Sequence, residues 1–202
     1  MSDTRYGFYL RPSAAMCRAQ AEVHALLARQ YNLRVAGRFM PHATIKGFFR
    51  SDAAIPEIVE RIDGAMAGRA PVTVTNRGPI AFGGSSIVLD VHYEADGATN
   101  AHLHALHEAS VAAILPVVHP DCDFTPGEWL GPVFFAHLTL AMTDLPERFA
   151  AEVLEFVIDL GPIGPDRFVA DTFQLFAFTS DDWAGQWSHS LQWNLLHSWR
   201  LG

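Results

Sequence analysis

Two short segments, half a chain apart, share the pattern of a histidine, any residue and a threonine inside an apolar run. The first copy holds His42 and Thr44, and the second holds His137 and Thr139, 95 residues later. Each copy lies among β-branched and aromatic residues, which is typical of a buried strand. Since side chains alternate between the two faces of a strand, the histidine and threonine of each copy point to the same face. Two such strands side by side place two imidazoles and two hydroxyls around one cleft.

The length and charge of the chain limit what it binds. At 202 residues, half of them hydrophobic, we expect a single domain spanning 1–202, built as two similar lobes that share a core and a cleft. The net charge of −8 argues against a long nucleic acid as the main ligand, because such binding needs many contacts from Lys and Arg to phosphates. A small ligand with one phosphate group is compatible with this charge.

The cysteines and the N-terminus indicate the cellular compartment. Cys17 and Cys122 form no C-x-x-C motif and suggest no disulfide framework, which favours a reducing cytoplasm. The N-terminus shows no signal peptide, and no apolar run approaches the roughly 20 residues of a membrane span. We therefore expect a cytoplasmic protein without a membrane partner; no pattern points to a particular oligomeric state.

The apolar periodicity predicts an order of elements that nearly repeats. The order is strand, helix, strand, helix, strand, strand, followed by helix, strand, helix, strand, strand, which is typical of an α+β or α/β chain. Besides the two motif strands, we expect strands at 6–10, 71–81, 86–91, 168–178 and 186–193 and helices at 14–30, 52–66, 99–115 and 147–160. Ser13, Asp52 and Thr99 or Asn100 are the expected helix caps.

With both motifs placed on strands, the sequence resembles the two-histidine (2H) phosphoesterases, which include the LigT-like 2′-5′ RNA ligases and cyclic phosphodiesterases. The signature of that superfamily is matched by His42-Ala43-Thr44-Ile45 and His137-Leu138-Thr139-Leu140. The stretches 173–180 and 187–195 are similar to the closing hairpin of the family. After the first motif the chain continues Lys46-Gly47-Phe48-Phe49, where family members more often have an aromatic residue before the glycine.

The resemblance implies a bilobal LigT-like α+β fold with pseudo-two-fold duplication, two antiparallel sheets around a central cleft and helices outside. It also implies metal-independent hydrolysis of a phosphodiester, often a 2′,3′-cyclic phosphate of a nucleotide or an RNA end, with reversible 2′-5′ ligation as a related activity. No cofactor is implied.

The chemistry of the motif residues agrees with this implication. Imidazole titrates near pH 6.5, so that one of His42 and His137 can accept a proton from water while the other donates one to the departing ribose oxygen. The hydroxyls of Thr44 and Thr139 can hold the phosphate oxygens. By strand alternation Lys46 lies on the same face as Thr44 and adds positive potential to the cleft. Trp183, in a C-terminal turn, is a candidate for stacking on a base.

Two alternatives remain open at this stage. The same scaffold can bind a nucleotide or RNA end without turning it over, although Arg suits simple phosphate binding better than His does. The region from His102 to Asp123 also contains His104, His107, His119, Asp121 and Cys122, and predicts a metal-dependent hydrolase if these residues converge. Leu103 and Leu106 occupy the inner stripe of that helix and turn His104 and His107 toward solvent, which disfavours a metal site.

Overall fold

The computed structural model describes residues 3–122 and 133–202 of the chain. Within these residues, four α-helices and nine β-strands form an α+β fold, as the sequence predicts. The helices are α1 (Ala14–Tyr31), α2 (Ile55–Met66), α3 (Ala101–Ile114) and α4 (Ala150–Asp159). The strands are β1 (Arg5–Arg11), β2 (Ala43–Phe49), β3 (Val72–Thr75), β4 (Pro79–Phe82), β5 (Ser86–Asp90), β6 (His137–Ala141), β7 (Arg167–Ala170), β8 (Thr172–Thr179) and β9 (Gln192–Arg200). No helix in the described ranges is long and apolar enough to cross a bilayer.

Seven of the strands form one antiparallel sheet in the order β4-β5-β6-β2-β1-β8-β9, and β3 pairs with β7 in a small second sheet. The large sheet consists of a three-stranded half, β4-β5-β6, and a four-stranded half, β2-β1-β8-β9. The two halves meet between β2 and β6, where Ala43 and Leu138 are the paired residues. The two expected lobes are therefore halves of one continuous sheet, joined by a very short ladder.

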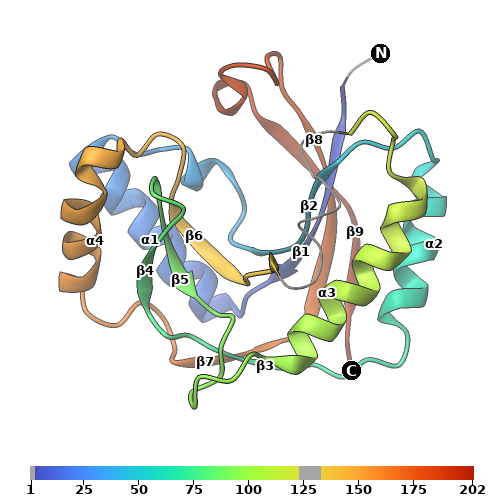
Figure 1. Ribbon diagram of the computed structural model, residues 1–202, viewed down its shortest axis with the longest axis horizontal. Coiled ribbons are helices and arrows are strands. Elements are labelled where there is room, and N and C mark those ends of the chain that lie inside the picture. Colours follow the sequence, from blue (N-terminus) through green and yellow to red (C-terminus); the bar gives the residue numbers. More distant parts are fainter. Residues whose placement is uncertain (1–2, 123–132) are drawn as a thin grey trace.

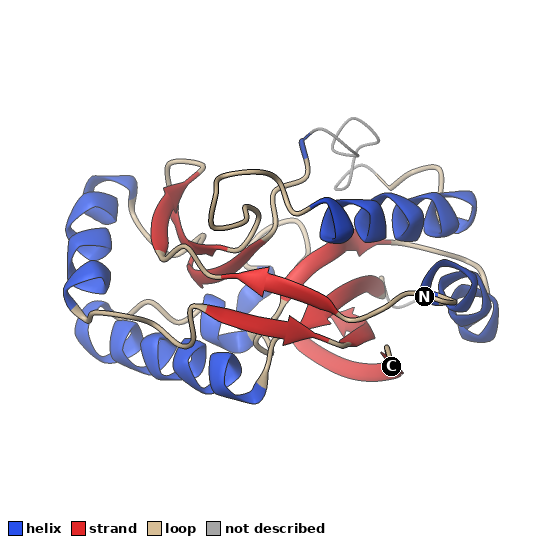
Figure 2. Cartoon of the chain, turned by 90° about the horizontal axis from the view of Figure 1, so that it is seen from below, coloured by secondary structure: helices blue, strands red, loops and turns tan. Residues whose placement is uncertain are grey.

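Each half of the sheet is covered by helices on its outer side (Figure 1). Helix α1 packs against β6 and α4 against β4 and β5, so both helices cover the three-stranded half. Helix α3 packs against β2, and α2 packs against α3 and β9, so this pair covers the four-stranded half. In Figure 2 the helices accordingly form two groups at opposite sides, with the strands between them.

The main hydrophobic core lies between the helices and the sheet. Its largest fully buried side chains include Phe8, Phe49, Phe173, Met16, Leu27, Ile58 and Ile62. A second, smaller cluster of Tyr9, Phe176 and Phe178 is separate from this core, and Phe39, Phe48 and Trp183 pack against it. Because Phe8 belongs to the main core and its neighbour Tyr9 to the small cluster, the two clusters lie on opposite faces of β1.

The helix caps match the sequence except at α2. The Ser13 side chain accepts a hydrogen bond from the Met16 amide (3.4 Å), and the Asn100 side chain accepts one from the Leu103 amide (3.0 Å). Asp52 is not the cap of α2, since that helix begins at Ile55 and the preceding Ala54 offers no side-chain acceptor. Pro56 in the first turn explains the later start, because its fixed φ and missing N–H suit that position.

Two of the predicted strands are each divided in two. The stretch 71–81 forms β3 and β4, separated by a turn in which the Asn76 side chain accepts from the Gly78 amide (3.1 Å) and Gly78 has φ of +89°. The stretch 168–178 forms β7 and β8, which belong to different sheets. The last strand begins at Gln192 rather than at residue 186, because residues 187–189 form a 3₁₀ turn.

Candidate active site

The antiparallel register brings the two motifs together at the junction of β2 and β6. Ala43, the central residue of the first motif, pairs with Leu138, the central residue of the second. Continuing this register places His42 across from Thr139 and Thr44 across from His137. Ala43 and Leu138 point into the main core. Because side chains alternate along a strand, the residues on either side of this pair point to the other face of the sheet, so all four motif side chains lie on the face away from the main core. Each half of the sheet thus contributes one imidazole and one hydroxyl.

The two imidazoles are fixed in the same way. Nδ1 of His42 lies 2.7 Å from the carbonyl oxygen of Met40, and Nδ1 of His137 lies 2.7 Å from the carbonyl oxygen of Phe135. A carbonyl can only accept, so each Nδ1 carries the hydrogen and donates it. In the neutral ring, Nε2 is then an acceptor that faces away from its own backbone. Both histidines are therefore held as the tautomer that can take a proton at Nε2.

Both imidazoles favour the neutral form at neutral pH. The pKa of His42 is lowered to about 4, chiefly by burial, against the raising effect of its hydrogen bond to Met40. Proximity to the His137 imidazole also lowers the pKa of His42. Burial likewise lowers the pKa of His137, again against its backbone hydrogen bond. An anion between the two rings reverses these effects and favours a proton on one of them.

The threonine hydroxyls are available to a ligand. Neither Thr44 nor Thr139 is fully buried, and neither hydroxyl makes a hydrogen bond to another described residue. The backbone of Thr139, by contrast, is firmly held, because its carbonyl oxygen lies 2.9 Å from Nε2 of Gln20 and 2.9 Å from Nε2 of His24, both on α1. The hydroxyls can therefore donate to an anion from fixed positions.

Tyr9 supports the His42 ring from the neighbouring strand. Its ring centroid lies 4.5 Å from that of His42, at 68° between the planes, and Tyr9 pairs with Thr44 across β1 and β2. The Tyr9 ring runs back along β1 over Gly7, and a Cβ atom at Gly7 would overlap it. The glycine at this position is thus required for Tyr9 to lie where it contacts His42.

His137 is supported by two phenylalanines. The Phe82 ring, at the end of β4, lies 4.8 Å from the His137 ring, and the Phe135 ring stacks on Phe82 at 5.3 Å. The buried Asp90 of β5 pairs with His137 across the ladder, and its carboxylate accepts from the His92 amide (2.9 Å). Sequence reasoning missed Phe82 and Asp90, and it considered Tyr9 only for stacking on a base, not as a support of His42. The available signals are the glycine two residues before Tyr9 on the same strand face and the Gly83-Gly84 turn that follows Phe82.

Lys46 does not lie on the cleft face, so its predicted place beside Thr44 is wrong. Tyr9 pairs with Thr44, but the next pair is Phe8 with Lys46, which leaves Ile45 as an extra residue on β2. This bulge turns Lys46 to the face of Phe8, where it is only 3% exposed, with Nζ 5.5 Å from the centroid of the core residue Phe49. Burial lowers the pKa of Lys46 to about 8.

Trp183 lies in the loop between β8 and β9. Its ring packs on Phe48 (5.5 Å), and the Arg5 guanidinium carbon lies 4.0 Å from its centroid. The indole N–H donates to the Asp3 carbonyl (2.6 Å). Trp183 therefore belongs to the aromatic cluster around Tyr9 and Phe178, and it makes no ring contact with either motif histidine.

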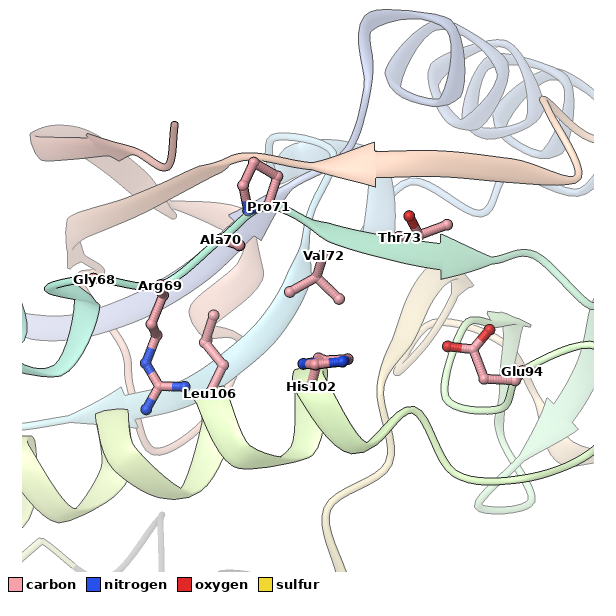
Figure 3. A pocket seen from close by; sticks show the side chains of 9 residues that line it. All are labelled: Gly68, Arg69, Ala70, Pro71, Val72, Thr73, Glu94, His102 and Leu106. Carbon is pink, nitrogen blue, oxygen red and sulfur yellow. The ribbon is translucent and has the colours of Figure 1, made fainter.

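The histidines of α3 do not converge on a common point. His107 is 4% exposed rather than solvent-facing, because its Nδ1 donates to the Ile45 carbonyl (2.7 Å) and its ring stacks on Phe134 at 3.8 Å. His102 instead lines a separate cavity of about 520 Å³ with Arg69 and Glu94 (Figure 3). Over the described ranges, no three His, Cys, Asp or Glu residues are grouped as metal ligands would be; Asp123 lies outside those ranges.

Comparison with solved structures shows the same fold in other proteins. TT0787 of Thermus thermophilus superimposes with a TM-score of 0.66 at 17% identity, covering 98% of this chain and 97% of that one. Escherichia coli LigT complexed with 3′-AMP gives a TM-score of 0.61 at 15% identity, and LigT complexed with NADP+ gives 0.60 at 16%; each covers 100% of this chain and 99% of LigT. A search of curated protein sequences finds no match.

A family model supplies the evidence for membership that these low identities do not. The model of the 2′-5′ RNA ligase superfamily matches residues 14–180, which contain both motifs and most of the chain. The chain therefore belongs to the 2′-5′ RNA ligase superfamily of two-histidine phosphoesterases.

Proposed function

We propose that this protein is a phosphodiesterase that opens 2′,3′-cyclic phosphates of nucleotides or RNA ends, with His42 and His137 as its acid and base. The observation that carries the proposal is the matched pair of imidazoles, each held as the same tautomer by a backbone carbonyl and each set across from a threonine hydroxyl without a partner among the described residues. This set supplies both proton transfers that a phosphodiester needs and requires no metal to do so.

In the hydrolytic direction, water attacks phosphorus and one ribose oxygen leaves. The neutral histidine on the side of the water takes its proton at Nε2 while the oxygen–phosphorus bond forms. The opposite histidine, protonated because the bound phosphate is anionic, gives its proton to the departing 2′ or 3′ oxygen. The hydroxyls of Thr44 and Thr139 donate to the non-bridging oxygens, where negative charge increases in the transition state.

The same site can use an alcohol as the nucleophile in place of water, so that ring opening leads to ligation instead of hydrolysis. A 5′-hydroxyl in place of water gives up its proton to the first histidine, and its oxygen bonds to phosphorus as the 2′,3′-cyclic ring opens. The product of that reaction is a phosphodiester linkage between two nucleosides, formed by the same two proton transfers. Reversible 2′-5′ ligation is thus part of the proposal.

The relatives support a nucleotide as the ligand. E. coli LigT is known in complexes with 3′-AMP and with NADP+, both of which carry a phosphate on a ribose. The net charge of −8 favours a small nucleotide or a short RNA end over a long polyanion.

The test is hydrolysis of the four 2′,3′-cyclic nucleotides, with chelator present, by the wild type and by His42→Ala and His137→Ala. We expect activity in the wild type that falls by at least about a hundredfold in each variant, because each removes one proton transfer. Identification of the product as a 2′- or 3′-phosphate then shows which oxygen leaves.

Other outcomes separate the competing functions. Tight nucleotide binding without turnover favours a non-catalytic binding module. Activity that disappears with chelator but survives both substitutions favours a metal-dependent hydrolase, and contradicts the proposal.

A further inference from the structure

The cavity beside His102 lies between α3 and the segment that connects α2 to β3 (Figure 3). Residues 68–73, Glu94, His102 and Leu106 line this α3 cavity. Its volume of about 520 Å³ is within the range of small-ligand sites in proteins. Its floor is apolar, since Val72 and Leu106 are only 6% and 1% exposed. None of the lining residues belongs to β2 or β6, so the α3 cavity is separate from the motif cleft.

Arg69 supplies a positive charge at one end of the cavity. Its side chain is half-buried, and its Nε donates to the carbonyl oxygen of Ala65 in the last turn of α2 (2.6 Å). The two terminal nitrogens of the guanidinium make no hydrogen bond or ion pair to another described residue. They are therefore available to a carboxylate, which a guanidinium binds through two parallel hydrogen bonds.

Glu94 supplies a negative charge at the other end. Its backbone is held in a turn, because its amide donates to the Ala98 carbonyl (2.7 Å) and its carbonyl accepts from the Gly97 amide (3.0 Å). One carboxylate oxygen accepts from the hydroxyl of the buried Thr75 on β3 (3.1 Å). The other oxygen has no partner among the described residues, and it can accept from an ammonium group.

The distance between these charges limits the length of the ligand. In Figure 3, Arg69 lies beside Leu106, one helical turn from His102, and Glu94 lies on the opposite side of His102. Four residues of α-helix rise about 6 Å. The ammonium and carboxylate of a free α-amino acid share one carbon, so they are too close together to reach both side chains. Two or three residues of extended peptide, at about 3.3–3.6 Å each, span such a distance.

The edge of β3 offers a backbone donor to the cavity. Thr73 pairs with Val169 of β7, and its carbonyl oxygen accepts from the Asn100 side chain at the start of α3 (2.8 Å). The carbonyl therefore points away from β7, and in an antiparallel ladder the amide of the same residue points the same way. The Thr73 amide thus faces the α3 cavity, where it can donate to a carbonyl of an extended peptide.

We propose that the α3 cavity binds a short peptide with two free termini. The carboxylate of the peptide lies on Arg69 and its ammonium group on Glu94. An apolar side chain in the middle of the peptide packs on Val72 and Leu106. This binding site goes beyond the proposed phosphodiesterase activity and does not depend on it.

The test is an NMR titration of the ¹⁵N-labelled protein with three probes. The first is the tripeptide Ala-Leu-Ala with free termini, the second its N-acetyl derivative and the third its C-terminal amide. We expect Ala-Leu-Ala to shift the amide signal of Thr73. Each modified probe should bind at least about tenfold more weakly, because it lacks one charged, hydrogen-bonded group.

Two variants assign the ends of the peptide. Glu94→Gln keeps an acceptor for Thr75, and we expect it to bind the free and the N-acetylated peptide equally. Arg69→Gln keeps a donor for Ala65, and it should bind the free peptide and the amide equally. Arg61→Gln is the matched control, because Arg61 lies on α2, pairs with Glu57 (3.2 Å) and does not line the cavity. It should distinguish the three probes as the wild type does.

Three results would overturn the inference. One is the absence of a saturable shift at Thr73 with millimolar Ala-Leu-Ala. The second is equal affinity of the wild type for all three probes. The third is the same loss of discrimination in Arg61→Gln, which would assign the effect to net charge rather than to the cavity. Hydrolysis of cyclic nucleotides is measured separately, and we expect it to stay within about twofold of the wild type in all three variants, since none changes a motif residue.

Discussion

At the scale of single residues, the position of His42 depends on Gly7, because glycine has no Cβ atom. The Tyr9 ring occupies the space over Gly7 and contacts the His42 ring at 4.5 Å between centroids. The imidazole is therefore held by two contacts, the hydrogen bond to the Met40 carbonyl and the Tyr9 ring of the neighbouring strand.

We expect Gly7→Ala to lower turnover by about ten- to a hundredfold, because a new Cβ displaces Tyr9 and misplaces the His42 imidazole, the acid or base of the proposed reaction. Turnover of a 2′,3′-cyclic nucleotide, with circular dichroism to check folding, measures this. Gly64→Ala is the matched control: Gly64 lies in α2 with open space around it, so alanine should leave turnover unchanged and raise stability by about 0.5–1 kcal/mol. Equal turnover in both variants would contradict the supporting role of Tyr9.

At this scale the sequence predicts the four residues to which we assign the reaction, but it does not predict which residues support them. His42, Thr44, His137 and Thr139 follow from the duplicated motif, and the register of β2 and β6 places them on one face. Phe82 supports His137 only because a hairpin folds back beside β6, a tertiary contact that no local pattern encodes.

At the scale of elements, the bulges of β2 decide which side chains reach the cleft. Strict alternation assigns Lys46 to the face of Thr44, but one extra residue at Ile45 moves it to the face of Phe8. Hydrophobic patterns also do not show where a chain leaves one sheet for another. For this reason the sequence predicts single strands at 71–81 and 168–178, where the structure has two each. The helices α1 and α3 follow their periodicity and caps closely, to within one or two residues at each end.

Lys46→Met tests the assignment of Lys46 to the core face. Burial of a charged ammonium is unfavourable, so we expect the variant to be as stable as the wild type or more stable, by up to about 2 kcal/mol in urea unfolding. Turnover should stay within about twofold. Thr44→Val, which changes a side chain on the cleft face, should lower turnover by about tenfold. A loss of activity in Lys46→Met as large as that in Thr44→Val would contradict the assignment of Lys46 to the core face.

Since β2 and β6 pair over only a very short ladder, some of their backbone carbonyls have no partner on the other strand and accept hydrogen bonds from helix side chains instead. The carbonyl of Thr139 is met by Gln20 and His24 of α1, and the carbonyl of Ile45 by His107 of α3. Buried carbonyls without a strand partner need such donors. The polar residues on the inner faces of these helices thus compensate for the separation of the two strands at the site.

At the scale of the whole molecule, the histidines make stability depend on pH. Burial is the main cause that lowers the pKa values of His24, His42, His92, His107 and His137. Below about pH 6.5 the unfolded chain then binds more protons than the folded one. Their contribution to stability is complete above that pH and is lost as the pH falls toward about 4, the pKa of His42.

We expect the free energy of unfolding, measured in urea, to fall by a few kcal/mol between about pH 7 and about pH 5. The double variant His42→Gln/His137→Gln should lose less over the same interval, because two of the buried groups no longer titrate. A free energy that is constant or rises as the pH falls would contradict the sign of these shifts.

The overall architecture was predictable because the order of elements nearly repeats, and the superfamily match over residues 14–180 agrees with it. The sequence does not predict that the two halves join into one sheet, because this depends on a single antiparallel pairing between segments 95 residues apart.

The helices are exchanged between the halves of the sheet, and this has a consequence for the integrity of the enzyme. Helix α1 connects two strands of the four-stranded half but packs on the three-stranded half, while α3 connects two strands of the three-stranded half and packs on β2. Separation of the halves would therefore expose the part of each hydrophobic surface that the exchanged helix covers.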